Sequence, residues 1–113
     1  MKYLRNIKPY ETVKLTDMIT NGSGKIASKA LVNNDKHEIR FFSFAKGEDI
    51  SKEIYEMESI FIVIEGKLKI NYKDNDEVIV NAGEMAALES EIPYGVEALT
   101  DVKLLNILIG ETE

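Results

Sequence analysis

The histidine and cysteine content limits the chemistry open to this sequence. It has one histidine, His37, and no cysteine. The lack of cysteine excludes disulfides, thiolate metal sites, iron–sulfur clusters and cysteine nucleophiles. His37 falls in a segment with the alternation of a β-strand, where a single histidine is usually structural. We therefore do not expect it to be catalytic.

Arg40 is the residue best suited to bind an anion. Successive side chains of a strand point to opposite faces, so Arg40 shares one face with Phe42 and Phe44. If that face is the interior, Arg40 is a strong anchor for a carboxylate or another anion. If it is the outer face, Arg40 is an ordinary surface charge or an interface residue. The two phenylalanines are predicted to be core residues in both cases.

Three glutamates, Glu53, Glu56 and Glu58, form an acidic cluster near the middle of the sequence. Carboxylates of this kind can bind a hard cation. Such a cluster on a loop is more often solvated surface, and the sequence alone is compatible with both interpretations.

The overall charge is negative, because 20 aspartates and glutamates outnumber 14 lysines and arginines to give a net charge of −6. This field repels phosphate backbones and anionic lipid headgroups, so we expect neither nucleic acid nor a membrane as a partner. The longest aliphatic run, residues 60–64, is far shorter than a membrane span, and the N-terminus lacks a signal-peptide core. We expect a cytoplasmic protein.

The segments that would position these residues are short and mostly extended. One helical turn is expected within 13–19, and a hairpin turn at 33–35. Many short strands without a long helix in 113 residues predict a single all-β domain, an antiparallel sandwich or barrel. The expected strands are 25–32, 36–45, 60–65, 67–72, 77–80, 84–88, 92–95 and 102–109.

The glycine spacing resembles the two-motif signature of the cupin superfamily. Gly47 opens a segment that ends at Gly66, and Gly83 follows after a hairpin-length interval. The resemblance covers residues 13–109 and implies a cupin double-stranded β-helix, a jelly-roll-like antiparallel barrel. It implies one domain over 1–113, with an N-terminal arm and strand in 1–24 and the barrel in 25–109. Three short segments also resemble the sequences of small single-domain cupins: Val63-Ile64-Glu65-Gly66, Asn81-Ala82-Gly83-Glu84 and Ile92-Pro93-Tyr94.

The resemblance also locates the positions at which cupins bind a metal, and all four are altered. Glu53 and Tyr55 stand at the first two histidine positions, Ser59 at the glutamate position and Tyr94 at the third histidine position. Imidazole suits iron, manganese, nickel and zinc, whereas a phenol must lose a proton near pH ~10 before it ligates well. We expect no metal cofactor, with a divalent metal on oxygen ligands as the weaker alternative.

These four residues have two interpretations. In one, they form a polar, aromatic-walled pocket for a small hydroxylated or amine-bearing molecule. In the other, they fill the space left by a lost metal. Further candidates for the pocket are Arg40, Phe42, Phe44 and Glu58.

The first functional expectation is a metal-free module that binds a small polar molecule or serves in assembly, and the resemblance implies a homodimer. The alternative is a metal-independent sugar isomerase or epimerase, with Glu53 as base and Tyr55 or Tyr94 as acid. The hypothesis of a metal-dependent cupin enzyme is less favoured than either. A third class of function is a structural or regulatory partner protein. A Glu53 buried beside a tyrosine in an open pocket would favour catalysis.

Overall fold

The structure, a computed structural model, describes residues 1–22 and 24–111. Short strands dominate this part of the chain, and a 3-10 turn is the one helical element in it. The elements are η1 (Leu15–Asp17), β1 (Ile26–Asn33), β2 (His37–Phe44), β3 (Asp49–Glu53), β4 (Glu58–Glu65), β5 (Lys67–Tyr72), β6 (Asp76–Asn81), β7 (Met85–Leu88), β8 (Tyr94–Ala98) and β9 (Val102–Ile109).

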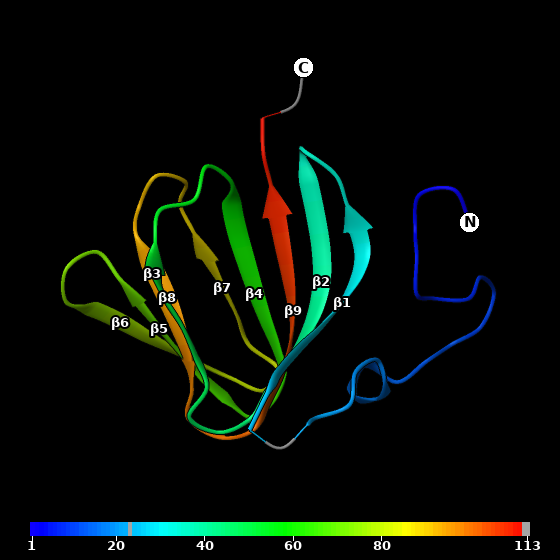
Figure 1. Cartoon of the computed structure of the whole chain (residues 1–113), viewed down its shortest axis with the longest axis horizontal. Helices are drawn as coiled ribbons and strands as arrows, with labels where there is room; N and C mark the ends of the chain where they lie inside the picture. Colours follow the sequence, from blue (N-terminus) through cyan, green and yellow to red (C-terminus); the bar gives the residue numbers. More distant parts are fainter. Residues whose placement is uncertain (23, 112–113) are drawn as a thin grey trace.

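The strands form two antiparallel sheets that face each other. One sheet has the order β1-β2-β9-β4-β7, and the other has the order β3-β8-β5-β6. Figure 1 looks between them, with the five-stranded sheet to the right and the four-stranded sheet to the left. This is the double-stranded β-helix of the cupins, so the expected all-β fold class is confirmed.

Alternation along the strands builds the core between the sheets. β5 buries Leu68 and Ile70 completely, while the residues on either side of each are less buried. β4 likewise turns Ser59, Phe61 and Val63 inward. Full burial of one such aliphatic side chain stabilises the fold by about 1.5–3 kcal/mol, so this face holds the sheets together.

The N-terminal segment covers the outer face of the five-stranded sheet. Met18 and Ile19, which follow η1, pack on the buried ring of Phe41 in β2. The Arg5 backbone N–H donates to the Leu31 carbonyl at 3.0 Å, and the Lys103 ammonium donates to the Thr16 carbonyl at 2.6 Å. The segment is therefore attached to β1 and β9 at a few points, and it lies at the right in Figure 1.

Three glycines of the cupin-like spacing stand in turns that need a left-handed backbone. Gly47, Gly66 and Gly83 have φ of +88°, +89° and +86°. Gly66 is also crowded, since a Cβ there would lie 2.1 Å from the Asp101 carbonyl oxygen. The glycine spacing therefore marks the turns of the barrel, because side chains are strained at these φ values.

Most expected elements are present within two residues of their predicted bounds, including the helical turn at η1 and the turn between β1 and β2. The strand expected within 1–24 does not form in the described residues of that range. In residues 1–22 and 24, η1 is the only regular element, because Met18 and Ile19 pack on a sheet face and do not extend an edge.

β3 was not expected from the sequence. Its five residues include a single apolar one, Ile50, and the others are exposed. The strand is held by pairing with β8, with an irregularity between Ile50 and Glu53. A polar edge strand of this kind has no hydrophobic alternation to reveal it.

No helix in the described residues is long and apolar enough to cross a membrane.

Candidate functional site

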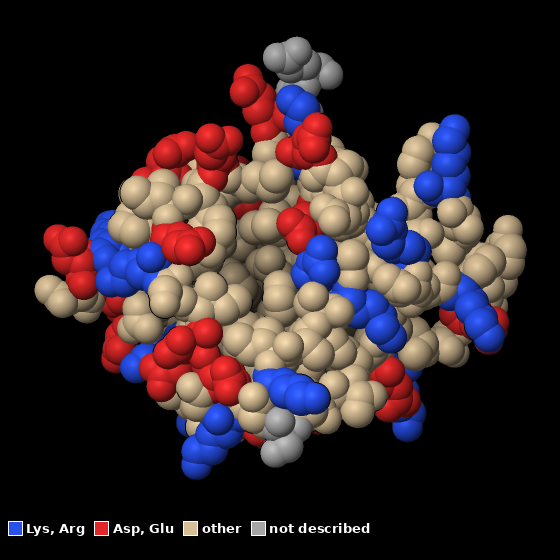
Figure 2. All heavy atoms as spheres, viewed as in Figure 1, with Lys and Arg blue, Asp and Glu red and all other residues tan. Residues whose placement is uncertain are grey.

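A pocket of about 140 Å³ lies between the two sheets. Its wall is mainly aromatic, with polar groups at separate points. The residues that matter most for its chemistry are Glu38, Phe42, Tyr55, Phe61, Tyr94 and Asn106. A wider, open groove of about 740 Å³ shares Tyr55 and Leu108 with this pocket, so the two meet at those side chains. Figure 2 shows a hollow at the centre of this face, largely uncharged inside and with charged groups around it.

Tyr94 is the centre of the aromatic wall. Its ring lies 4.8 Å from the Tyr55 ring, and 5.9 Å from the Phe61 ring in an edge-to-face arrangement. Phe42 and Phe44 lie 5.8 Å apart on β2. Aromatic pairs at these separations add to the stability gained by burial alone, so the wall is preformed and not a loose collection of rings.

The polar floor of the pocket is Asn106, which is held in place by Ser59. The Asn106 side-chain amide donates to the Ser59 hydroxyl at 2.9 Å and to the Ile60 carbonyl at 3.1 Å. Both side chains are buried, with exposed fractions of 7% and 1%. A buried amide must be hydrogen-bonded to avoid a large desolvation cost, and here β4 supplies both acceptors.

The two tyrosines are shifted toward their neutral, protonated form. Burial raises the pKa of Tyr55, and the negative charge of Glu53 and the nearby Tyr94 raise it further. Burial also raises the pKa of Tyr94, while a hydrogen bond with Ser59 offsets part of that shift. At neutral pH both phenols therefore carry a proton and can donate or accept a hydrogen bond.

Three of the four residues at the family's metal positions, Tyr55, Ser59 and Tyr94, come together in or under the pocket wall. Glu53 lies beside Tyr55, whose pKa it raises, but it is exposed at the end of β3, opposite Tyr94 in register, and does not line the pocket. Glu58 is an exposed residue at the start of β4. No three His, Cys, Asp or Glu side chains within residues 1–22 and 24–111 are arranged to hold a metal ion.

The donor set does not fit the metal that the cupin fold implies. It offers two phenols whose pKa values are raised, a serine hydroxyl already bonded to Asn106, and an exposed carboxylate. Divalent transition metals need deprotonated or imidazole ligands, and protonated phenols do not supply them.

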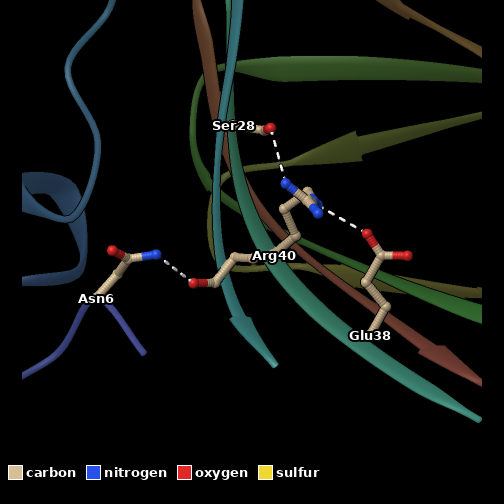
Figure 3. Close-up of polar contacts among 5 residues, drawn as sticks. Asn6, Ser28, Glu38 and Arg40 are labelled. Carbon is tan, nitrogen blue, oxygen red and sulfur yellow. Dashed lines mark hydrogen bonds and ion pairs between the residues drawn. The ribbon is translucent and has the colours of Figure 1, made fainter. Parts of the chain in front are cut away.

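Arg40 lies on the interior face of β2, which settles the alternative left open by the sequence. Phe44 belongs to the core between the sheets, and Phe42 packs against it. The Arg40 Nε–H donates to the Glu38 carboxylate at 2.7 Å, and Nη1 donates to the Ser28 hydroxyl of β1 at 3.0 Å (Figure 3). His37 begins β2 on the opposite face, and its backbone N–H bonds to Asn34 in the turn.

Sequence reasoning missed Glu38 and Asn106. Glu38 continues the same period-two face as Arg40, Phe42 and Phe44. Asn106 is the one polar residue on the buried face of β9, among Val102 and Leu104. For Asn106 the available signal was a polar residue at an inward position of an apolar strand, and for Glu38 it was the face shared with Phe42 and Phe44.

Comparisons with known proteins agree with this architecture. The profile of the cyclic nucleotide-binding domain matches residues 41–108, more than half of the chain. A conserved protein of unknown function from Streptococcus pyogenes superposes with a TM-score of 0.95 at 21% identity, covering 100% of this chain and 98% of that one. The search of curated proteins gave no match.

Two further solved structures are named as cupins. A cupin superfamily protein from Desulfitobacterium hafniense has a TM-score of 0.89 at 22% identity, with 96% of this chain and 98% of that chain covered. A cupin 2 conserved barrel domain protein from Leptotrichia buccalis has a TM-score of 0.84 at 22% identity, with 91% and 49% covered. At these identities the likeness shows the fold.

Proposed function

Because the chain belongs to the family of the cyclic nucleotide-binding domain and has a cupin barrel, we propose that the barrel interior binds a small polar molecule. In this proposal the protein is a binding module, and its side chains hold the molecule directly without a metal. The observation that carries the proposal is the preformed pocket of about 140 Å³ between the sheets, with protonated Tyr55 and Tyr94 on its wall and Asn106 on its floor.

The size of the pocket favours a ligand smaller than a nucleotide. Sites for drug-sized molecules span about 300–1,000 Å³. The barrel pocket is smaller, at about 140 Å³. A cyclic nucleotide, the ligand in the description of the matched family, is therefore an outcome of the test and not our expectation.

Binding is also favoured over isomerase chemistry. A base works best when it is held in the site with a pKa near the working pH, and the same is true of an acid. Glu53, the candidate base, is exposed at the end of β3. The pKa of each candidate acid, Tyr55 and Tyr94, is raised above 10.0, which makes it a poorer proton donor.

The proposal is tested by thermal unfolding of the full chain with a panel of small polar molecules and with cyclic AMP and cyclic GMP. Ligands that bind only the native state raise the melting temperature, and the rise grows with the ligand concentration relative to Kd. Leu108→Trp fills the junction of pocket and groove, and Ile107→Trp, on the opposite face of β9, is its matched control.

We expect a stabilising molecule to act on the wild type and on Ile107→Trp, and to lose its effect on Leu108→Trp. Stabilisation of all three proteins alike would place binding outside the barrel and overturn the proposal. Stabilisation by a cyclic nucleotide, abolished by Leu108→Trp, would replace our ligand with that of the matched family.

We also propose that the protein pairs with a second copy of itself through its N-terminal segment, in the cytoplasm. Six of the eleven large hydrophobic side chains that are exposed in the described residues belong to residues 1–15. Unburied apolar surface of this extent favours association. The supporting residues are Met1, Tyr3, Leu4, Tyr10, Val13 and Leu15.

A further inference from the structure

We propose that the molecule bound in the barrel is a small zwitterion with an ammonium and a carboxylate next to a short apolar side chain, as in a free aliphatic α-amino acid. Arg40 binds its carboxylate and Glu38 binds its ammonium. This inference rests on the proposed function, because it names the ligand class of the same pocket.

Both charged residues belong to the pocket side of β2. Glu38 lines the pocket itself. Arg40 follows on the same face, between Glu38 and the pocket residue Phe42, and its Cα is paired with that of Asn106 in the neighbouring strand β9. Glu38 therefore lies at the edge of the pocket, and Arg40, bonded to Glu38 and paired with Asn106, lies just beyond the residues that line it.

The pair has hydrogen-bonding capacity left for a ligand. A guanidinium has five N–H donors, and Arg40 uses Nε for Glu38 and one on Nη1 for Ser28 in the described part of the chain. A carboxylate accepts at two oxygens, and among the described residues Glu38 is contacted through Oε1. A ligand can bind both residues without breaking the bond between them.

The pair is sheltered but accessible. The exposed fractions of the Arg40 and Glu38 side chains are 22% and 26%. Charge-assisted hydrogen bonds made by partly desolvated groups are stronger than those made in open water. Figure 3 shows the guanidinium between Ser28 and Glu38, on the inner side of β1 and β2.

The charge balance selects a zwitterion over a simple anion. Arg40 and Glu38 cancel, and the net charge of the chain is −6. A free anion would meet repulsion from Glu38 and from the field of the whole protein. A molecule with adjacent opposite charges satisfies both residues and adds no net charge.

The remaining wall suits a short hydrocarbon group. Phe42, Ile50 and Leu108 line the pocket with the aromatic rings. The pocket volume of about 140 Å³ suits a small occupant, of about amino-acid size. Leucine is therefore a suitable probe, and two analogues remove one charge each: isoamylamine lacks the carboxylate, and isocaproate lacks the ammonium.

Isothermal titration of the full chain with these three compounds tests the inference. We expect leucine to bind at least about tenfold more tightly than either analogue, since each analogue loses a hydrogen-bonded charge. Arg40→Gln should weaken leucine about tenfold or more and improve isoamylamine relative to isocaproate. Glu38→Gln should also weaken leucine but reverse the preference between the two analogues.

Arg5→Gln is the matched control, because Arg5 is the only other arginine and binds β1 through its backbone. It should leave all three affinities unchanged. Circular dichroism verifies that each variant is folded. Should a single variant misfold, the double variant Glu38→Gln, Arg40→Gln leaves no unpaired charge, and it is expected to lose the preference for leucine.

The inference and the proposed function fail in different ways. Equal binding of the three compounds, or binding unaffected by Arg40→Gln, would overturn the zwitterion while leaving a pocket ligand in place. If leucine does not bind but another molecule stabilises the wild type and not Leu108→Trp, the zwitterion is also overturned and the proposed function stands. If no compound binds in a manner sensitive to Leu108→Trp, both are wrong.

Discussion

The buried amide of Asn106 joins two strands of the barrel and forms part of the pocket floor. Asn106→Ala removes the donor to the Ser59 hydroxyl, which lies in a fully buried position. We expect the free energy of unfolding to fall by about 1–3 kcal/mol, because a buried polar group loses its partner. Urea unfolding measures the change.

A double-mutant cycle with Ser59→Ala separates this bond from general packing. Removing both partners should cost less than the sum of the single changes, since neither group is then left unsatisfied. Asn75→Ala, at an exposed turn position, is the control and should change stability by no more than about 0.5 kcal/mol. Strict additivity of the pair would contradict the hydrogen bond.

The buried phenol of Tyr94 and the half-buried phenol of Tyr55 give stability a defined dependence on pH. The pKa values of Tyr55 and Tyr94 are raised by burial above 10.0, so the folded protein holds these protons more tightly than the unfolded chain. This contribution is complete below about pH 10, and it is lost as pH rises through the folded-state pKa values. Urea unfolding between pH 8 and pH 11 should show the decline, and Tyr55→Phe with Tyr94→Phe should make it shallower.

Tyrosinate absorbance gives an independent measurement. Of the five tyrosines, two should titrate later in the folded protein than in urea. Simultaneous titration of all five in the folded state would contradict the burial of this pair. Tyr3→Phe is the control, because Tyr3 is exposed and its replacement should leave the late-titrating pair unchanged.

Among the strands, β3 contributes Ile50 to the pocket, and Gly95 lets β3 approach β8 closely. A Cβ at Gly95 would lie 2.6 Å from the Ile50 carbonyl oxygen and 2.8 Å from the Lys52 nitrogen. Both are backbone atoms, so a side chain there must move the strand. Gly95→Ala should destabilise the fold by about 1–3 kcal/mol and loosen β3.

Hydrogen exchange measures this effect strand by strand. Faster exchange is expected in β3, with little change in β1 and β9. Gly22→Ala is the control, because its Cβ would meet the flexible side chain of Lys25 at 3.3 Å. A stable Gly95→Ala with unchanged β3 exchange would show that the close approach is not required.

The elements could be predicted wherever hydrophobic alternation or turn glycines determine them. β5 and β9 were predicted at their observed bounds, since their apolar residues alternate in burial. β3 could not be, because pairing with β8 and not burial makes it a strand. The site was accessible only in part: Tyr55, Ser59 and Tyr94 follow from the cupin-like spacing, whereas the contacts of Arg40 with Glu38 and Ser28 depend on how β1 and β2 pair.

For the whole molecule, the N-terminal segment is the main source of uncovered apolar surface. The double variant Tyr10→Ser, Leu15→Ser removes two of its exposed side chains. We expect the wild type to sediment as a dimer and this variant to shift toward monomer, because the association loses buried apolar area. Analytical ultracentrifugation over a range of concentrations measures the shift.

Ile79→Ser is the control for self-association, since Ile79 is an exposed residue of β6 in the other sheet. This variant should remain a dimer. A monomeric wild type, or an N-terminal variant that dimerises as well as the wild type, would contradict pairing through residues 1–15.

In our proposal, the barrel interior binds a small molecule with its own side chains. Native mass spectrometry of the full chain, after treatment with a chelator, tests this most directly with the molecule that most raises the melting temperature. We expect a one-to-one complex, free of metal, for the wild type and Ile107→Trp, and none for Leu108→Trp. A complex that forms only after a divalent metal is restored, or one that Leu108→Trp forms equally well, would contradict the proposal.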